Sequence, residues 1–176
     1  LGATSLAAFG TAVRLEYLLY PLNFSMGAAV LAMMSSNIGA RQFARAARIA
    51  WIALGLSASA MASVSVLAIA APGLWMGLFS DDAKILADGT LYLAIVGIAY
   101  PFVSGTLLNS AFQSTRQPQW PLIAMSCRLA VVLLGGWIAI EILHAGLVGI
   151  AIVTALGLVT MGGVLIGAFR FFAKLG

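Results

Sequence analysis

Glu16 is the one acidic residue of this 176-residue chain that lies well inside a long apolar stretch. Within a membrane, an ionisable side chain is costly and usually marks an ion or substrate pathway or a charged partner. Tyr20 and Asn23 follow at positions i+4 and i+7, so on a helix they share a face with Glu16. Two interpretations stay open. The polar stripe lines a water-filled cavity, or Glu16 lies at the outer interface and pairs with Arg14 or Lys84.

A second set of small and polar residues recurs at steps of four. It consists of Gly97, Pro101, Gly105, Asn109 and Gln113. The amides of Asn109 and Gln113 can hydrogen-bond an organic substrate or, as the favoured interpretation, a neighbouring helix. Pro101, and Pro21 in the first stretch, are predicted bending points because proline removes an i→i−4 hydrogen bond.

The residues needed for enzyme chemistry are missing from the sequence. One histidine (His144) and one cysteine (Cys127) cannot build a metal site. No phosphate-binding or dinucleotide-binding glycine motif is present. We therefore expect no enzyme activity, no metal, no cofactor and no nucleic-acid partner.

The composition is that of a membrane protein, with 62% hydrophobic and only 8% charged residues. Soluble domains are roughly a quarter charged. Apolar runs of about 20 residues span a bilayer as helices, because hydrocarbon leaves no other partner for the backbone. The sequence predicts an all-α polytopic bundle with five spans, at residues 3–38, 49–71, 89–112, 122–142 and 147–172. The first is either one long protruding helix or a short helix before Arg14 and then a span.

Charges predict the orientation of these spans. One side holds the basic residues Arg41, Arg45, Arg48, Arg116, Arg128, Arg170 and Lys174. The other holds Arg14, Lys84, Glu16, Asp81, Asp82, Asp88 and Glu141. Basic loops stay in the cytoplasm, so the C-terminus is expected there.

Three local interpretations accompany this orientation. Arg128 is expected to reach the cytoplasmic surface with its long side chain. Arg41, Arg45 and Arg48 are expected on one face of a short helical segment. The small residues of the second span are expected in a helix contact, and they are Gly55, Ser59 and Ser63.

Four segments resemble the multidrug and toxic compound extrusion (MATE) family. They are R-L-E-Y-L-L-Y-P-L-N-F-S-M-G-A-A at 14–29, S-S-N-I-G-A-R-Q-F-A-R-A at 35–46, L-F-S-D-D-A at 78–83 and Y-L-A-I-V-G-I-A-Y-P-F at 92–102. The resemblance implies twelve spans in two six-helix lobes, of which this chain is similar to the last five. Residues 1–176 would then form a partial C-terminal lobe, with the N-terminal lobe absent and expected as its partner.

The resemblance also implies secondary active transport in the bacterial inner (plasma) membrane. The family exports organic, often cationic compounds in exchange for H⁺ or Na⁺, by alternating access between the lobes. Some members have an aspartate in the tenth span, where this chain has Val103, Ser104 and Gly105. Glu16, with Arg14, is then the candidate left for coupling.

Two alternatives to an antiporter remain. One is a lipid-linked oligosaccharide flippase of related architecture, which needs a cationic cavity for its pyrophosphate. Arg14 is the only candidate for that role, since the other arginines are expected at the cytoplasmic edge. The second alternative is a non-transporting assembly subunit of a membrane complex.

Overall fold

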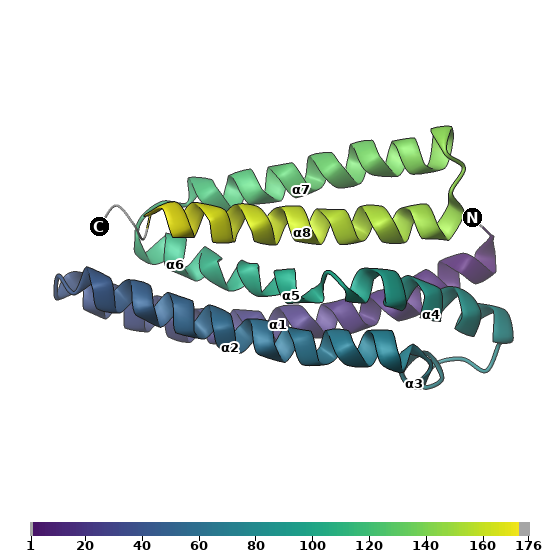
Figure 1. The fold of residues 1–176 in the computed structure, drawn as a ribbon, viewed down its shortest axis with the longest axis horizontal. Helices are drawn as coiled ribbons and strands as arrows, with labels where there is room; N and C mark the ends of the chain where they lie inside the picture. Colours follow the sequence, from purple (N-terminus) through teal and green to yellow (C-terminus); the bar gives the residue numbers. More distant parts are fainter. Residues whose placement is uncertain (1, 173–176) are drawn as a thin grey trace.

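A computed structural model describes residues 2–172, which form a helix bundle without strands (Figure 1). Lys174, one of the predicted cytoplasmic cations, lies outside the described residues. The elements in chain order are α1 (Ala3–Gly39), α2 (Phe43–Ala70), α3 (Pro72–Met76), α4 (Ala83–Gly97), α5 (Tyr100–Val103), the 3₁₀ helix η1 (Ser104–Leu107), α6 (Leu108–Ser114), α7 (Gln119–Trp137), the π-helical η2 (Ile138–Ile142) and α8 (Gly146–Phe172).

Four helical segments are long and apolar enough to cross a membrane, namely α1, α2, α7 with η2, and α8. A fifth span forms if α4 and the segment from α5 to α6 are counted together, as a pair bent by 58°. The predicted membrane helix bundle is therefore confirmed. Helices α2 and α4 begin six residues before the predicted spans, at Phe43 and Ala83, because helices continue past the apolar run. Asp82 caps α4, with Oδ1 accepting from the backbone N–H groups of Lys84 (2.9 Å) and Ile85 (3.1 Å).

Helix α1 is a single helix of 37 residues. Its length is about 56 Å, well beyond the roughly 30 Å of a hydrocarbon core. A separate short helix before Arg14 is therefore not present. Pro21 lies inside α1, and the helix continues through it without a break.

The bent span packs between the α1–α2 pair and α8, and α7 lies antiparallel to α8 on the outside (Figure 1). Helix α7 has Ala124 as its one buried residue, which fits this outer position. Buried apolar side chains form two clusters. One is centred on Phe112, Leu165 and Phe169, and the other on Tyr92, Leu93 and Val96.

The break between α4 and α5 falls at Ile98–Ala99, two residues before Pro101, one of the two predicted bending points. Proline has no N–H, so the carbonyl of Gly97 has no i+4 partner. The Ser65 hydroxyl of α2 donates to that carbonyl at 2.6 Å. The bend is therefore stabilised by a side chain from a neighbouring span, as expected for irregular backbone inside a membrane protein.

The small-residue stripe of α2 does not pack against another helix within the described residues. Gly55, Ser59 and Ser63 are all exposed, and both hydroxyls donate to carbonyls one turn earlier in α2. The buried face of α2 instead contains Ser57 and Met61. The predicted contact is therefore not formed within residues 2–172, and it stays a prediction for parts of the protein outside them.

Candidate functional site

Glu16 is buried in the middle of α1, with 6% of its surface exposed. The hydroxyl of Tyr92, a fully buried residue of α4, donates to Glu16 Oε1 at 2.9 Å. Arg14 is exposed, and its guanidinium carbon lies 5.2 Å from the centroid of the Phe79 ring. Lys84 is exposed at the start of α4. The structure therefore places Glu16 inside the bundle and not at an interface beside these two cations.

Arg128 of α7 also points into the bundle. Its Nη1 donates to the hydroxyl of Tyr20 on α1 at 2.9 Å, and it interacts electrostatically with Glu16. The same nitrogen lies 3.8 Å from the sulfur of Met161 on α8. The expectation that Arg128 reaches the cytoplasmic surface is wrong. Helix α7 begins at Gln119, which puts Arg128 about 14 Å along it, and inward partners hold the side chain.

Tyr100 adds a second hydroxyl near the carboxylate. It is fully buried, its Oη has no hydrogen-bond partner among the described residues, and it interacts electrostatically with Glu16. We call Glu16, Tyr20, Tyr92, Tyr100 and Arg128 the Glu16 cluster. It joins α1, α4, α5 and α7, and Thr154 of α8 lies beside the Tyr92 hydroxyl.

Asn23 continues the predicted face of α1 but has a different partner. It is 2% exposed, and its Nδ2 donates to the carbonyl of Val103 at 3.0 Å. The Ser57 hydroxyl of α2 donates to its Oδ1. The shared face of Glu16, Tyr20 and Asn23 therefore contacts several helices. The two cavities described in the structure are lined by other residues.

The second predicted set is divided between elements. Gly97 ends α4, whereas Asn109 and Gln113 belong to α6, beyond the bend and the 3₁₀ turn. A 3₁₀ turn has three residues per turn, so a spacing of four no longer keeps one face across it. Asn109 is half-buried, and its Oδ1 has no partner among the described residues, while Gln113 is exposed. Within the described residues, neither amide forms a hydrogen bond with a member of the Glu16 cluster.

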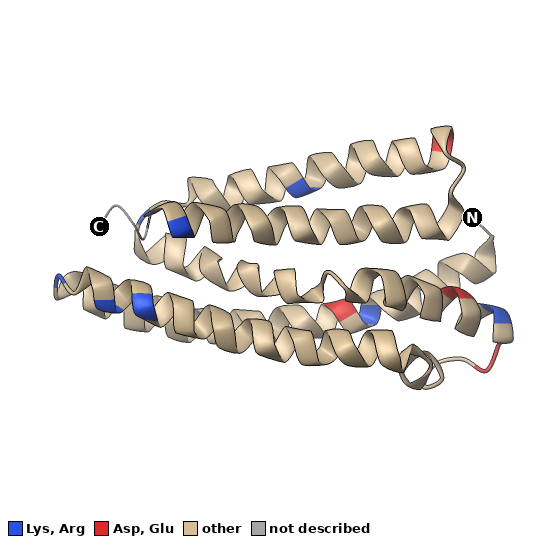
Figure 2. Cartoon of the chain, in the orientation of Figure 1, with Lys and Arg blue, Asp and Glu red and all other residues tan. Residues whose placement is uncertain are grey.

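Figure 2 shows basic segments at one end of the bundle and acidic segments at the other. The predicted separation of charge thus holds for the described residues apart from Arg128 and Glu16, which lie inside the bundle. Arg41 lies in the turn between α1 and α2 with a φ of 59°, while Arg45 and Arg48 lie in the first turns of α2. The expected single helical face of three arginines is therefore corrected to a turn followed by a helix.

Sequence reasoning found the α1 part of the cluster and missed Tyr92, Tyr100 and Arg128. Each of the three has a polar or charged group within an apolar stretch, and that is the signal that marks them. Within residues 2–172, no group of histidine, cysteine or acidic side chains could hold a metal ion.

The structure is that of a multi-pass membrane protein, because it has long apolar helices and a broken span. The polar and charged side chains of the Glu16 cluster lie within the helix bundle. A family model described as MatE matches residues 1–138, which includes the whole Glu16 cluster. The chain belongs to this MATE family of transporters. No curated protein matches the chain.

Proposed function

We propose that the protein is a secondary active transporter that exports organic, often cationic compounds in exchange for H⁺ or Na⁺. The observation that supports this proposal is the buried Glu16 carboxylate, hydrogen-bonded to Tyr92 in the middle of a membrane helix. Intramembrane acids of this kind belong to ion pathways in pumps and transporters. The end rich in arginine faces the cytoplasm of a bacterial inner membrane in this proposal.

The chemistry of exchange follows from one carboxylate with several competing partners. An ionised Glu16 can be neutralised by a proton, a sodium ion or a cationic substrate. Because these partners exclude one another, release of one favours binding of the next. A protonated Glu16 is a donor, and the Tyr100 hydroxyl is a nearby group without a partner among the described residues. Protonation also removes the charge that attracts Arg128.

Alternating access requires a second lobe that moves against this one. In transporters built from repeats, one bundle rocks against the other around a site near the membrane midplane. In our proposal residues 1–176 belong to the C-terminal lobe, and an N-terminal lobe of the same protein is its partner. The bend before Pro101 is the flexible point of this lobe.

The test is Glu16→Gln in the protein as its gene encodes it, assayed in inside-out membrane vesicles. We expect ion-driven uptake of a cationic dye to fall at least about tenfold, since loss of a coupling acid removes the exchange step and each tenfold is 1.4 kcal/mol. The matched control is Glu141→Gln, because Glu141 is exposed on η2 and lies outside the cluster. Equal uptake by both variants at equal expression would remove Glu16 from the coupling role.

A lipid-linked oligosaccharide flippase is the second candidate, favoured by the inward position of Arg128. A pyrophosphate group needs a net positive site. Arg128 is paired with Tyr20 and faces Glu16, so the cluster has no excess positive charge. A flippase would move its lipid in vesicles without an ion gradient and would lose that activity in Arg128→Gln. Dye uptake that depends on a gradient in the same vesicles would exclude it.

A further inference from the structure

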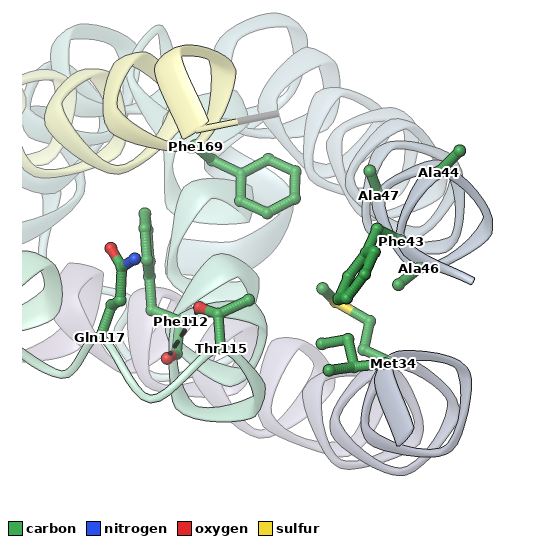
Figure 3. A pocket seen from close by; sticks show the side chains of 10 residues that line it. Met34, Phe43, Ala44, Ala46, Ala47, Phe112, Thr115, Gln117 and Phe169 are labelled. Carbon is green, nitrogen blue, oxygen red and sulfur yellow. Dashed lines mark hydrogen bonds between the residues drawn. The ribbon is translucent and has the colours of Figure 1, made fainter. Parts of the chain in front are cut away.

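A cavity of about 340 Å³ opens at the basic end of the bundle, away from the Glu16 cluster. It lies between the end of α1, the first turns of α2 and the ends of α6 and α8. Met34 and Phe43 line one side, and Phe112 and Phe169 face them across the gap (Figure 3). The Thr115 hydroxyl, also in the lining, already donates to the Ala111 carbonyl. The walls are therefore mainly apolar and suit a hydrocarbon group.

The size and position of this cavity fit a lipid chain. Its volume is within the usual range for sites that bind small organic ligands. The α1–α2 turn extends beyond the ends of α6 and α8, so one wall reaches past the other (Figure 1). An acyl chain gains little by leaving one apolar medium for another, but an empty cavity loses dispersion contacts along its whole lining. An acyl chain can therefore fill the cavity, but the selection of one lipid over another must come from its headgroup.

Three arginines directly follow cavity-lining residues in the sequence, so the surroundings of the cavity carry positive charge. Arg45 follows Ala44, Arg116 follows Thr115, and Arg170 follows Phe169. All three arginines are exposed. The acids of the described chain lie at the opposite end or within the Glu16 cluster (Figure 2). A cationic ligand is repelled at this rim, and an anionic one is attracted.

We propose that this cavity binds one acyl chain of an anionic phospholipid, whose phosphate lies among Arg45, Arg116 and Arg170. The site is separate from the transport pathway proposed above and does not depend on it. It would fix an anionic lipid between the α1–α2 turn and the ends of α6 and α8. Charge complementarity at the rim and the apolar walls each support this occupant independently.

The experiment measures thermal denaturation of the purified protein, as its gene encodes it, in detergent with added lipid. The lipids are phosphatidylglycerol and phosphatidylcholine with identical chains. We expect phosphatidylglycerol to raise the denaturation midpoint at lower concentration than phosphatidylcholine. Arg45→Gln and Arg170→Gln should each weaken its apparent affinity about fivefold, from the typical contribution of one basic residue near an anionic lipid. Equal protection by the two lipids would overturn the proposal.

A pair of alanine substitutions tests the cavity itself. Ala47 lines the cavity and Ala62 does not, although both are half-buried on α2. Ala47→Phe places a ring on the cavity side of α2 and should weaken phosphatidylglycerol binding about tenfold or more, whereas Ala62→Phe should leave it unchanged. Equal binding by the two variants would show that the lipid sits elsewhere. Protection by inorganic phosphate alone at the same concentration would refute the role of the acyl chain.

Discussion

Replacing Gly162 with alanine should destabilise the protein, because α8 meets the backbone of the broken span at this glycine. A methyl group on Gly162 would overlap the carbonyl oxygen of Phe102. On the facing side, a Cβ on Gly105 would lie 2.7 Å from the Cα of Gly162. The obstructing atoms belong to the main chain, so they cannot turn aside as the end of a flexible side chain would.

The free-energy cost of Gly162→Ala follows from the distance by which α8 must move away from the broken span. Carbon atoms in good contact are about 3.5–4.0 Å apart, so relieving an overlap of this kind requires a shift of roughly 1 Å between α8 and the broken span. Overpacking a close-packed interior costs about 1–3 kcal/mol. We expect the upper part of that range for Gly162→Ala, since two backbones must separate.

The neighbouring residue gives a matched control for this substitution. Gly163 has no atom within 4 Å of the position where a Cβ would stand. Gly163→Ala should therefore be neutral or stabilising by up to about 1 kcal/mol, the helix propensity difference between the two residues. The two variants should differ by about 2–4 kcal/mol in denaturant unfolding of the purified protein, followed by helical circular dichroism. Equal stability of both variants would refute the close contact of α8 with the broken span.

Two further substitutions test the polar contacts between spans. Ser65→Ala should cost about 1–3 kcal/mol, because it leaves the Gly97 carbonyl buried without its donor. The control Ser63→Ala, an exposed hydroxyl that bonds within its own helix, should change unfolding by less than about 0.5 kcal/mol. Tyr20→Phe removes the hydroxyl that accepts a hydrogen bond from Arg128. It should lower the free energy of unfolding by about 1.5 kcal/mol in the same assay, which is the lower end of the range for hydrogen bonds to charged groups. An unchanged unfolding free energy for Tyr20→Phe would show that this bond contributes nothing.

The sequence was sufficient to predict the elements and one face of the site. The spans follow from the length of apolar runs, and the shared face of Glu16, Tyr20 and Asn23 follows from helical spacing along an unbroken α1. The partners of this face could not be predicted in the same way. Tyr92 and Arg128 are 76 and 108 residues from the side chains they contact, and only packing of the spans brings them together.

The failures also have physical causes. The sequence predicts Arg128 at the surface because a long side chain near a helix end can reach water, yet the Tyr20 hydroxyl on another helix competes for it. Spacing alone predicts Asn109 and Gln113 on one face with Gly97. The bend and the 3₁₀ turn change the direction and phase of the helix between them, and neither change is encoded in a four-residue repeat.

Helix α1 contacts the broken span on both sides of its bend. Glu16 accepts a hydrogen bond from Tyr92 before the bend, and Asn23 donates to the Val103 carbonyl after it. These two residues are seven positions apart on one continuous helix, which fixes their separation at about 10 Å along its axis. Helix α1 therefore spans the bend, and the angle between the two arms of the broken span cannot change much while both hydrogen bonds persist. Of these two α1 residues, only Glu16 can gain or lose charge, so in the exchange mechanism proposed above an ion that neutralises Glu16 would act at the contact that ties α1 to α4.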